Sequence, residues 1–318
     1  MTKRSDATKD DANQRIDPGW FPFEYHVDFL QFLRDHDDVI EILTYSDLAW
    51  GDDWNYENNY LQELRDWKRQ LASGERDRDR IYVLLQHDVD RLPDRTAALL
   101  YEEERLEVPS NVMLFNRQLN RRLLKTTREL AYCDYKINDE YLRHLQDDCR
   151  FVIGYHSNAY EQALFDADRA LEIFQQDVTA LRRRFRVHYF SPHGGVRDAK
   201  GRSNARLEVP PSLRKSIRWV ANGFTVRFDG SYSDGGINGR RLDPAHRDLR
   251  QFVRSWKRGK RYRVLTHPQY YFSPHHRSGR LAGTPWYDEI LETYASDLNG
   301  NAWKAVWNKV LPPRENLT

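Results

Sequence analysis

Hydrophobic positions along the chain alternate between two repeat patterns. From residue 81 onward, short apolar runs of strand length alternate with longer segments whose apolar residues recur every three or four positions. The runs of strand length lie at 81–86, 110–116, 150–156, 187–193 and 262–267. The helical pattern covers 138–148, where Asn138 is placed to cap the first turn, and 160–185, which predicts one long helix. This alternation predicts an α/β fold with a mostly parallel sheet or barrel.

The preceding part of the chain divides into two segments. Its first residues are polar and predict a disordered lead. After the lead, the pattern predicts a helix from Tyr25 onward, a strand at 39–45 and a helix at 59–72. We therefore expect three regions: the lead at 1–18, an N-terminal elaboration at 19–80 that packs on a barrel, and the barrel at 81–318.

Composition and charge narrow the classes of protein. Hydrophobic residues make up 39% of the 318 positions, enough to bury a sizeable core, and two cysteines are too few for a disulfide framework or a cysteine-based zinc site. The net charge of +2 gives no drive toward nucleic acid or an anionic membrane, so we interpret the basic run 254–263 as a solvated helix end. No segment approaches the roughly 18 apolar residues that span a bilayer, and the N-terminus has no secretory-signal pattern. We expect a cytoplasmic protein without membrane or nucleic-acid partners.

Four of the predicted strands end on polar residues with catalytic or ligand chemistry. The first ends on His87, Asp88 and Asp90, the third on His156, the fourth on Ser191 and His193, and the last on His267. In such folds the active site lies at the carboxyl ends of the strands. Residues two apart in an extended segment point the same way, so Asp88 and Asp90 are predicted to reach into one site while Val89 packs behind. The alternatives are that polar residues simply resume where strands end, and that Asp90 caps the next helix.

The predicted cluster combines carboxylates with imidazoles. Adjacent carboxylates repel each other, and a divalent cation or a retained proton relieves the repulsion. His156 could equally bond to backbone, and His193, in a Pro-His-Gly-Gly loop, could be a metal ligand, a hydrogen-bond donor or a loop buttress. Pro268 keeps the chain extended beside His267, which suits a general acid. Asp234 could orient His267, although a role in a turn is the favoured interpretation.

The order and spacing of these motifs resemble the polysaccharide deacetylases of carbohydrate esterase family 4, the NodB-homology group, in a divergent branch with the motif HDVD. The resemblance covers roughly Ile81–Phe272. It implies a distorted (β/α)7 barrel of the polysaccharide-deacetylase type. It also implies that Asp88 is the catalytic base and His267 the catalytic acid, and that Asp90 and His156 are metal ligands.

Two positions depart from the pattern of that family. The second metal histidine of the family corresponds to Tyr160 in this chain, and the arginine that holds the base corresponds to Ser191. Asp90 and His156 alone are too few ligands for tight zinc binding. His193 is the candidate third ligand.

The resemblance implies a metal-dependent hydrolase that removes an N-acyl group, typically acetyl, from a saccharide or related small amide, and we expect a cytosolic saccharide intermediate as the substrate. The implied cofactor is a divalent metal, zinc in the first place, with cobalt or nickel possible. The alternative is a non-catalytic carbohydrate-binding protein on a degenerate deacetylase fold, which the departures at Tyr160 and Ser191 favour. The oligomeric state stays open.

Overall fold

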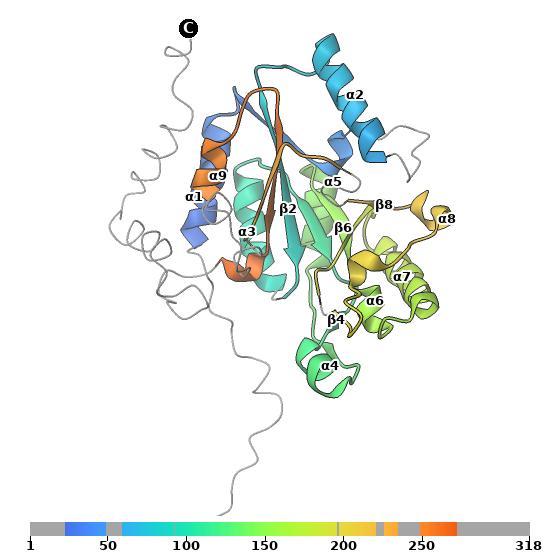
Figure 1. The fold of residues 1–318 in the computed structure, drawn as a ribbon. Helices are drawn as coiled ribbons and strands as arrows, with labels where there is room; N and C mark the ends of the chain where they lie inside the picture. The colour runs from blue at the N-terminus through green and yellow to red at the C-terminus, as the bar shows by residue number, and fades with distance from the viewer. Residues whose placement is uncertain are drawn as a thin grey trace, which may run out of the picture.

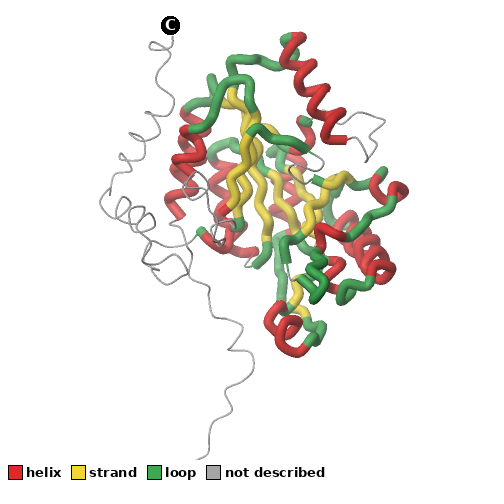
Figure 2. Tube along the Cα trace, viewed as in Figure 1, coloured by secondary structure: helices red, strands yellow, loops and turns green. Residues whose placement is uncertain are grey.

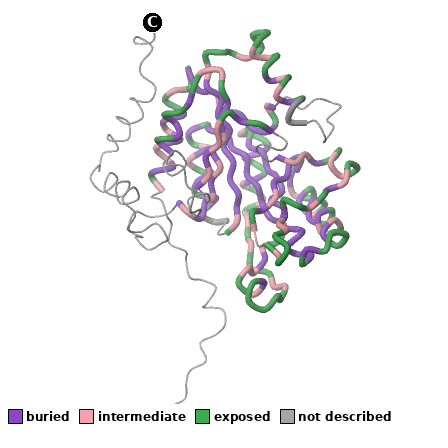
Figure 3. Tube along the Cα trace, in the orientation of Figure 1, coloured by how far each residue is buried: buried purple, intermediate pink, exposed green. Residues whose placement is uncertain are grey.

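The structure of the chain is a computed structural model that describes residues 23–48, 59–91, 93–195, 197–220, 226–234 and 249–271. The predicted lead at 1–18 and the last part of the predicted barrel, 272–318, lie outside the described residues. Buried positions concentrate along the strands, and the helices expose one side to solvent (Figure 3).

Eight parallel strands form one sheet, which curls into half a barrel within the described residues (Figures 1 and 2). Its order is β8-β7-β6-β3-β2-β10-β9, and β1 pairs with β2 beside this path. The strands are β1 (Ile40–Leu43), β2 (Ile81–Val89), β3 (Asn111–Leu114), β6 (Val152–Ser157), β7 (Tyr189–Pro192), β8 (Arg218–Trp219), β9 (Gly230–Ser233) and β10 (Arg261–Thr266). A separate antiparallel hairpin joins β4 (Gln118–Leu119) and β5 (Tyr132–Cys133). The predicted α/β class with a parallel, barrel-like sheet is confirmed.

The described α-helices are α1 (Phe23–Asp35), α2 (Asn59–Ser73), α3 (Pro93–Arg105), α4 (Arg121–Thr127), α5 (Asp139–Asp148), α6 (Ala159–Gln162), α7 (Ala167–Arg182), α8 (Pro211–Arg214) and α9 (Leu249–Arg254). Short 3-10 helices lie at η1 (Tyr45–Asp47), η2 (Asn204–Arg206) and η5 (Pro268–Tyr270). Asn138 caps α5 as predicted, because its side-chain oxygen accepts a hydrogen bond from the Tyr141 amide at 3.1 Å. Among the helices of the described ranges, none has the length and apolarity that crossing a membrane requires.

The prediction of one long helix over 160–185 is wrong, because the chain forms two helices there. Leu164 and Phe165 adopt φ angles of 52° and 67°, in the left-handed region that ends a helix. The Phe165 amide donates to the Tyr160 carbonyl at 2.8 Å, which closes the end of α6. Asp166 then caps α7, accepting a hydrogen bond from the Arg169 amide at 2.9 Å.

β2 is buried over its whole length because its two faces pack against different layers. Ile81, Val83 and Leu85 lie in a cluster with residues of α1, α3, α9 and β10. Tyr82 and Leu84 lie in another cluster with residues of β1, α2 and β7. A strand covered on both faces is apolar at successive positions, which explains the continuous run in the sequence. The same alternation of faces continues into the polar end of the strand.

β1 and β3 lie end to end along one side of β2. β1 pairs with 81–84 and β3 with 86–89. Where they meet, the buried side chain of Asn111 accepts a hydrogen bond from the Tyr45 amide at 2.8 Å and donates to the Leu85 carbonyl at 2.7 Å. Parts of the predicted N-terminal elaboration, β1 and α1, therefore contact the sheet directly.

Candidate metal centre

The predicted site residues stand at the carboxyl ends of neighbouring strands. β3 lies between β2 and β6, β7 lies on the far side of β6, and β10 lies on the other side of β2. Because these strands are parallel, their carboxyl ends meet at one edge of the sheet. The register places His156 opposite Ser191, and Thr266, the residue before His267, opposite His87. Helix α4 lies beyond this edge (Figure 1).

Asp90, His156 and His193 come together, as predicted, with ligand atoms all within 4.8 Å of one another. Asp90 Oδ1 lies 3.2 Å from His156 Nε2 and 3.5 Å from His193 Nε2. Two ligands about 2.1 Å from a tetrahedral ion lie about 3.4 Å apart, so these separations fit a shared divalent ion. Asp90 Oδ1 is buried and has no hydrogen-bond partner in the described part of the chain, which is how a free ligand atom presents itself.

His156 is oriented by the next strand. Its Nδ1 lies 2.9 Å from Ser191 Oγ, and its Nε2 faces Asp90. Metal-bound histidines are usually held in this way through their second ring nitrogen. Ser191, at the position where the resembled family has an arginine, is therefore a supporting residue of the cluster.

His193 is oriented by Glu161, a residue of α6 that the sequence analysis missed. Its Nδ1 lies 3.0 Å from Glu161 Oε2, and both side chains are buried. An ionised carboxylate only accepts hydrogen bonds, so Nδ1 carries the proton in the neutral imidazole and Nε2 offers its lone pair toward Asp90. Gly195 makes this contact possible, because a Cβ there would lie 2.2 Å from Glu161 Oε1.

Asp90 and His193 each stabilise the charged form of the other side chain. Burial raises the pKa of Asp90, but the charge of His193 and the close contacts with His156 and His193 outweigh burial and hold that pKa well below the usual range. Burial lowers the pKa of His193, whereas Asp90 and Glu161 raise it above its ordinary value of 6.5. A proton and a divalent cation therefore compete for the same imidazole.

Asp88 lies beside the cluster, on the same face of the chain as Asp90, as predicted. Its Oδ2 is 3.7 Å from His156 Nε2. Its Oδ1 accepts a hydrogen bond from Gln86 Nε2 at 2.7 Å and lies 3.5 Å from Ser191 Oγ. Gln86 is not among the predicted site residues, although its position two residues before Asp88 is a signal that both share one face of the strand.

His267 is held by Asp234, the interpretation that the sequence analysis did not favour. Asp234 Oδ2 accepts a hydrogen bond from the His267 amide at 2.6 Å, and Oδ1 lies 2.5 Å from His267 Nδ1. Burial lowers the pKa of His267, but Asp234 and then Asp90 and Asp88 raise it to about 10. The imidazole is therefore protonated at neutral pH, as a proton donor must be.

Tyr160 does not enter the cluster. Its buried ring packs against Phe165 at a centroid distance of 5.3 Å, and its hydroxyl lies 3.3 Å from Arg202 Nη1. The second imidazole of the cluster comes instead from His193, which reaches it from the loop after β7.

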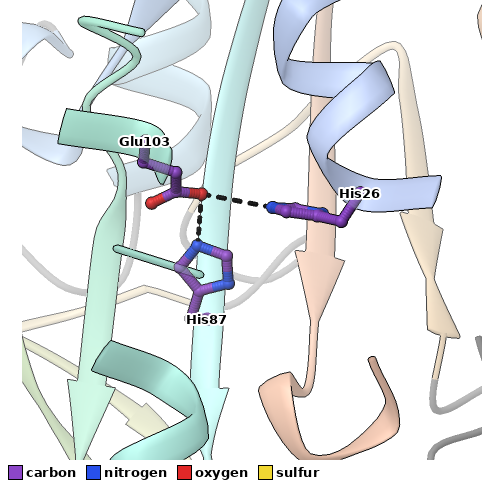
Figure 4. Close-up of side chains that lie close together, drawn as sticks. All are labelled: His26, His87 and Glu103. Atoms are coloured by element: carbon purple, nitrogen blue, oxygen red, sulfur yellow. Dashed lines mark hydrogen bonds and ion pairs between the residues drawn. The ribbon is translucent and has the colours of Figure 1, made fainter. Parts of the chain in front are cut away.

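A second group of ligand-type side chains lies on the other face of β2 (Figure 4). It consists of His26 of α1, His87 of β2 and Glu103 of α3, all buried. Glu103 Oε1 lies 2.7 Å from His87 Nε2 and 3.4 Å from His26 Nε2. The shorter distance is that of a hydrogen bond and is less than the about 3 Å that separates two ligands at right angles on one ion. The arrangement therefore favours a hydrogen-bonded network over a metal centre.

This network links helix α3 to the ends of β2 and β10. Ser110 Oγ donates to Glu103 Oε2 at 2.6 Å, and His87 Nδ1 lies 2.6 Å from Thr266 Oγ1. Burial raises the pKa of Glu103, but His87 and His26 lower it to about 2, so the carboxylate is ionised. Because both strand ends continue directly into candidate site residues, the network holds the two strands in register at the site.

Comparison of the chain with protein-family models, curated proteins and solved structures found no match. The resemblance to polysaccharide deacetylases therefore rests on the order and spacing of the motifs alone.

Proposed function

We propose that the protein is a metal-dependent hydrolase that removes an N-acyl group, acetyl in the first place, from a saccharide or related amide. The fold assigned with this proposal is a (β/α) barrel of the polysaccharide-deacetylase type. One observation carries the proposal. The ligand atoms of Asp90, His156 and His193 face a shared point, and Asp88 lies against the imidazole of His156. Asp90 and Asp88 both raise the pKa of His267, so its imidazole lies within electrostatic reach of these two carboxylates.

The three side chains fit a divalent ion with an open position, since three nitrogen and oxygen ligands are typical of catalytic zinc. Bound there, zinc, cobalt or nickel would supply Lewis acidity and a more acidic water.

The remaining steps of the proposed reaction are proton transfers, which Asp88 and His267 carry out. Asp88, which Gln86 and Ser191 hold in place, accepts a proton from the attacking water. The water oxygen bonds to the acyl carbon and the bond from that carbon to nitrogen breaks. His267, which Asp234 orients, donates its proton to the leaving nitrogen. The products are a carboxylic acid and an amine.

The alternative of a carbohydrate-binding protein without catalysis is less well supported. It was favoured by the loss of a ligand at Tyr160 and of a base-holding arginine at Ser191. His193 offers a third ligand, and Ser191 lies within 3.5 Å of Asp88. His193 can therefore take the place of the missing ligand, and Ser191 that of the missing arginine.

Elemental analysis of protein purified without chelating resin tests the proposal. We expect about one equivalent of zinc, cobalt or nickel in the wild type and its loss in Asp90→Asn, which keeps the size of the side chain but removes its charge. The metal-loaded wild type should release acetate from N-acetylated sugars, and Asp90→Asn should not.

Asp168→Asn is the matched control, because Asp168 is exposed on α7 and should leave metal content unchanged. Absence of metal in the wild type, even after reconstitution, would contradict the proposal. Sugar binding that a chelator does not affect would then favour the binding protein.

A further inference from the structure

Arg121 brings a positive charge to the candidate metal centre from outside the sheet. It is the first residue of α4, in the excursion that carries β4 and β5 and lies beyond the carboxyl ends of the strands (Figure 1). Asn120 caps this helix, accepting a hydrogen bond from the Leu123 amide at 3.2 Å, so the first turn is fixed. Arg121 lines a small pocket together with Asp90, Glu161 and His193.

The guanidinium of Arg121 lies against the ring of His193. Its Nη2 is 3.2 Å from His193 Nδ1 and also contacts His193 Nε2. Its Nε is buried and has no hydrogen-bond acceptor, and no carboxylate of the described ranges lies within salt-bridge distance of it. Glu161, which lines the same pocket, is directed to His193 instead.

The contact with His193 and a metal ion exclude each other. A guanidinium only donates hydrogen bonds, and His193 Nδ1 is turned to Glu161, so Nε2 is the one ring nitrogen that can accept from Arg121. The same Nε2 faces Asp90, at 3.5 Å, and is the atom that would bind a metal. Once its lone pair is used by the ion, Arg121 is left beside the site as a donor in need of an acceptor.

None of the surrounding carboxylates forms an ion pair with Arg121 in the described part of the chain, and three of them face other groups. Asp88 is bound by Gln86, Asp234 by His267, and Glu161 by His193. Arg121 is therefore a cation beside the metal ligands with which an anionic group could pair.

We propose that Arg121 binds an anionic group of the substrate, a carboxylate or a phosphate, next to the acyl group that is cut. The inference rests on the proposed function and narrows its substrate to acidic N-acyl compounds. Arginine suits this role because its planar fork matches the oxygens of a carboxylate or phosphate.

Equilibrium binding of three hydroxamates to the zinc-loaded protein, measured by calorimetry, tests the inference without relying on turnover. Acetohydroxamate offers a metal-binding group alone, succinic monohydroxamate adds a carboxylate, and phosphonoacetohydroxamate adds a phosphonate. We expect the wild type to bind at least one acidic probe about 10- to 100-fold more tightly than acetohydroxamate. Arg121→Met should lose this preference while it keeps its affinity for acetohydroxamate, and the better acidic probe identifies the anion.

Arg117→Met is the matched control, because it removes an exposed arginine from the same excursion, where the guanidinium lies over the Tyr132 ring. The Arg117→Met variant should keep the preference for an acidic probe over acetohydroxamate. Binding of acetohydroxamate without any preference for an acidic probe would overturn the inference alone, as would an equal loss of all probes in Arg121→Met. A wild type that holds no zinc and binds no probe would overturn the proposed function as well.

Discussion

Three imidazoles of the candidate site share one arrangement at the scale of single residues. In each, Nδ1 faces an oxygen of a neighbouring side chain, which leaves Nε2 available for a ligand or a proton. The pairs are His156 with Ser191, His193 with Glu161, and His267 with Asp234. Two of the oxygens belong to carboxylates and one to a hydroxyl. The carboxylates of Glu161 and Asp234 raise the pKa of His193 and of His267, respectively, because a carboxylate stabilises a charged imidazole.

The buried carboxylate of Glu103 makes an acid-sensitive contribution to stability. Its pKa in the folded protein is about 2, below the ordinary 4.5, so this contribution is complete above pH 4.5 and is lost as the pH falls toward 2. We expect the free energy of unfolding to fall more steeply over this window in the wild type than in Glu103→Gln. At neutral pH the variant should be less stable by roughly 3 kcal/mol, because it leaves the buried histidines without a charged partner.

Urea denaturation at a series of pH values measures both quantities. Glu140→Gln, which changes an exposed carboxylate in the first turn of α5, should follow the slope of the wild type. Parallel slopes for the wild type and Glu103→Gln would show that the charge of Glu103 does not stabilise the fold.

The sequence predicted the residues of the cluster better than the residues that support it. Asp90, His156 and His193 could be placed together because each follows a predicted parallel strand, and parallel strands end at one edge. Glu161 could not, because it stands inside a helical pattern and its partner, His193, is 32 residues away. Arg121 is 72 residues from His193 and reaches it through an excursion whose path no local pattern predicts.

At the scale of elements, the break between α6 and α7 shows where periodicity misleads. Apolar residues continue through Ala163, Leu164 and Phe165, so the helical pattern runs across the break without interruption. The polar residue that follows, Asp166, was the available signal, since aspartate is favoured at a helix N-cap. The break matters for the site because a separate, short α6 carries Glu161.

Asp166→Ala should destabilise the protein by about 1 kcal/mol, because the amide of Arg169 loses its hydrogen-bond acceptor. Chemical denaturation at neutral pH measures the change. Asp168→Ala removes an acidic residue from the same first turn without removing the cap, and its effect should be a few tenths of a kcal/mol. Equal effects of the two substitutions would mean that the cap at Asp166 contributes nothing beyond its charge.

At the scale of the whole molecule, the proposed metal ties together strands that are distant in the sequence. Its three ligands stand at the carboxyl ends of β2, β6 and β7, so an ion that binds the folded chain alone should stabilise the entire sheet. With free zinc at about 1,000 times its dissociation constant, linkage gives about 4 kcal/mol, which corresponds to a rise in Tm of about 5 to 10 °C.

Differential scanning calorimetry before and after removal of zinc with EDTA measures this effect. The wild type should lose the added Tm on chelation, and Asp90→Asn should melt at one temperature with or without zinc. An equal response of both proteins to zinc would place the ion elsewhere in the chain.

The end-to-end arrangement of β1 and β3 has a consequence for how the chain can be divided. Backbone N–H and C=O groups of 81–84 find their partners on one side in β1, which precedes them by about forty residues. A chain that started at residue 81 would keep every ligand of the cluster and yet expose this stretch as a bare strand edge. Such an edge is open to pairing with a strand of another molecule. By covering it, β1 also protects the sheet against aggregation.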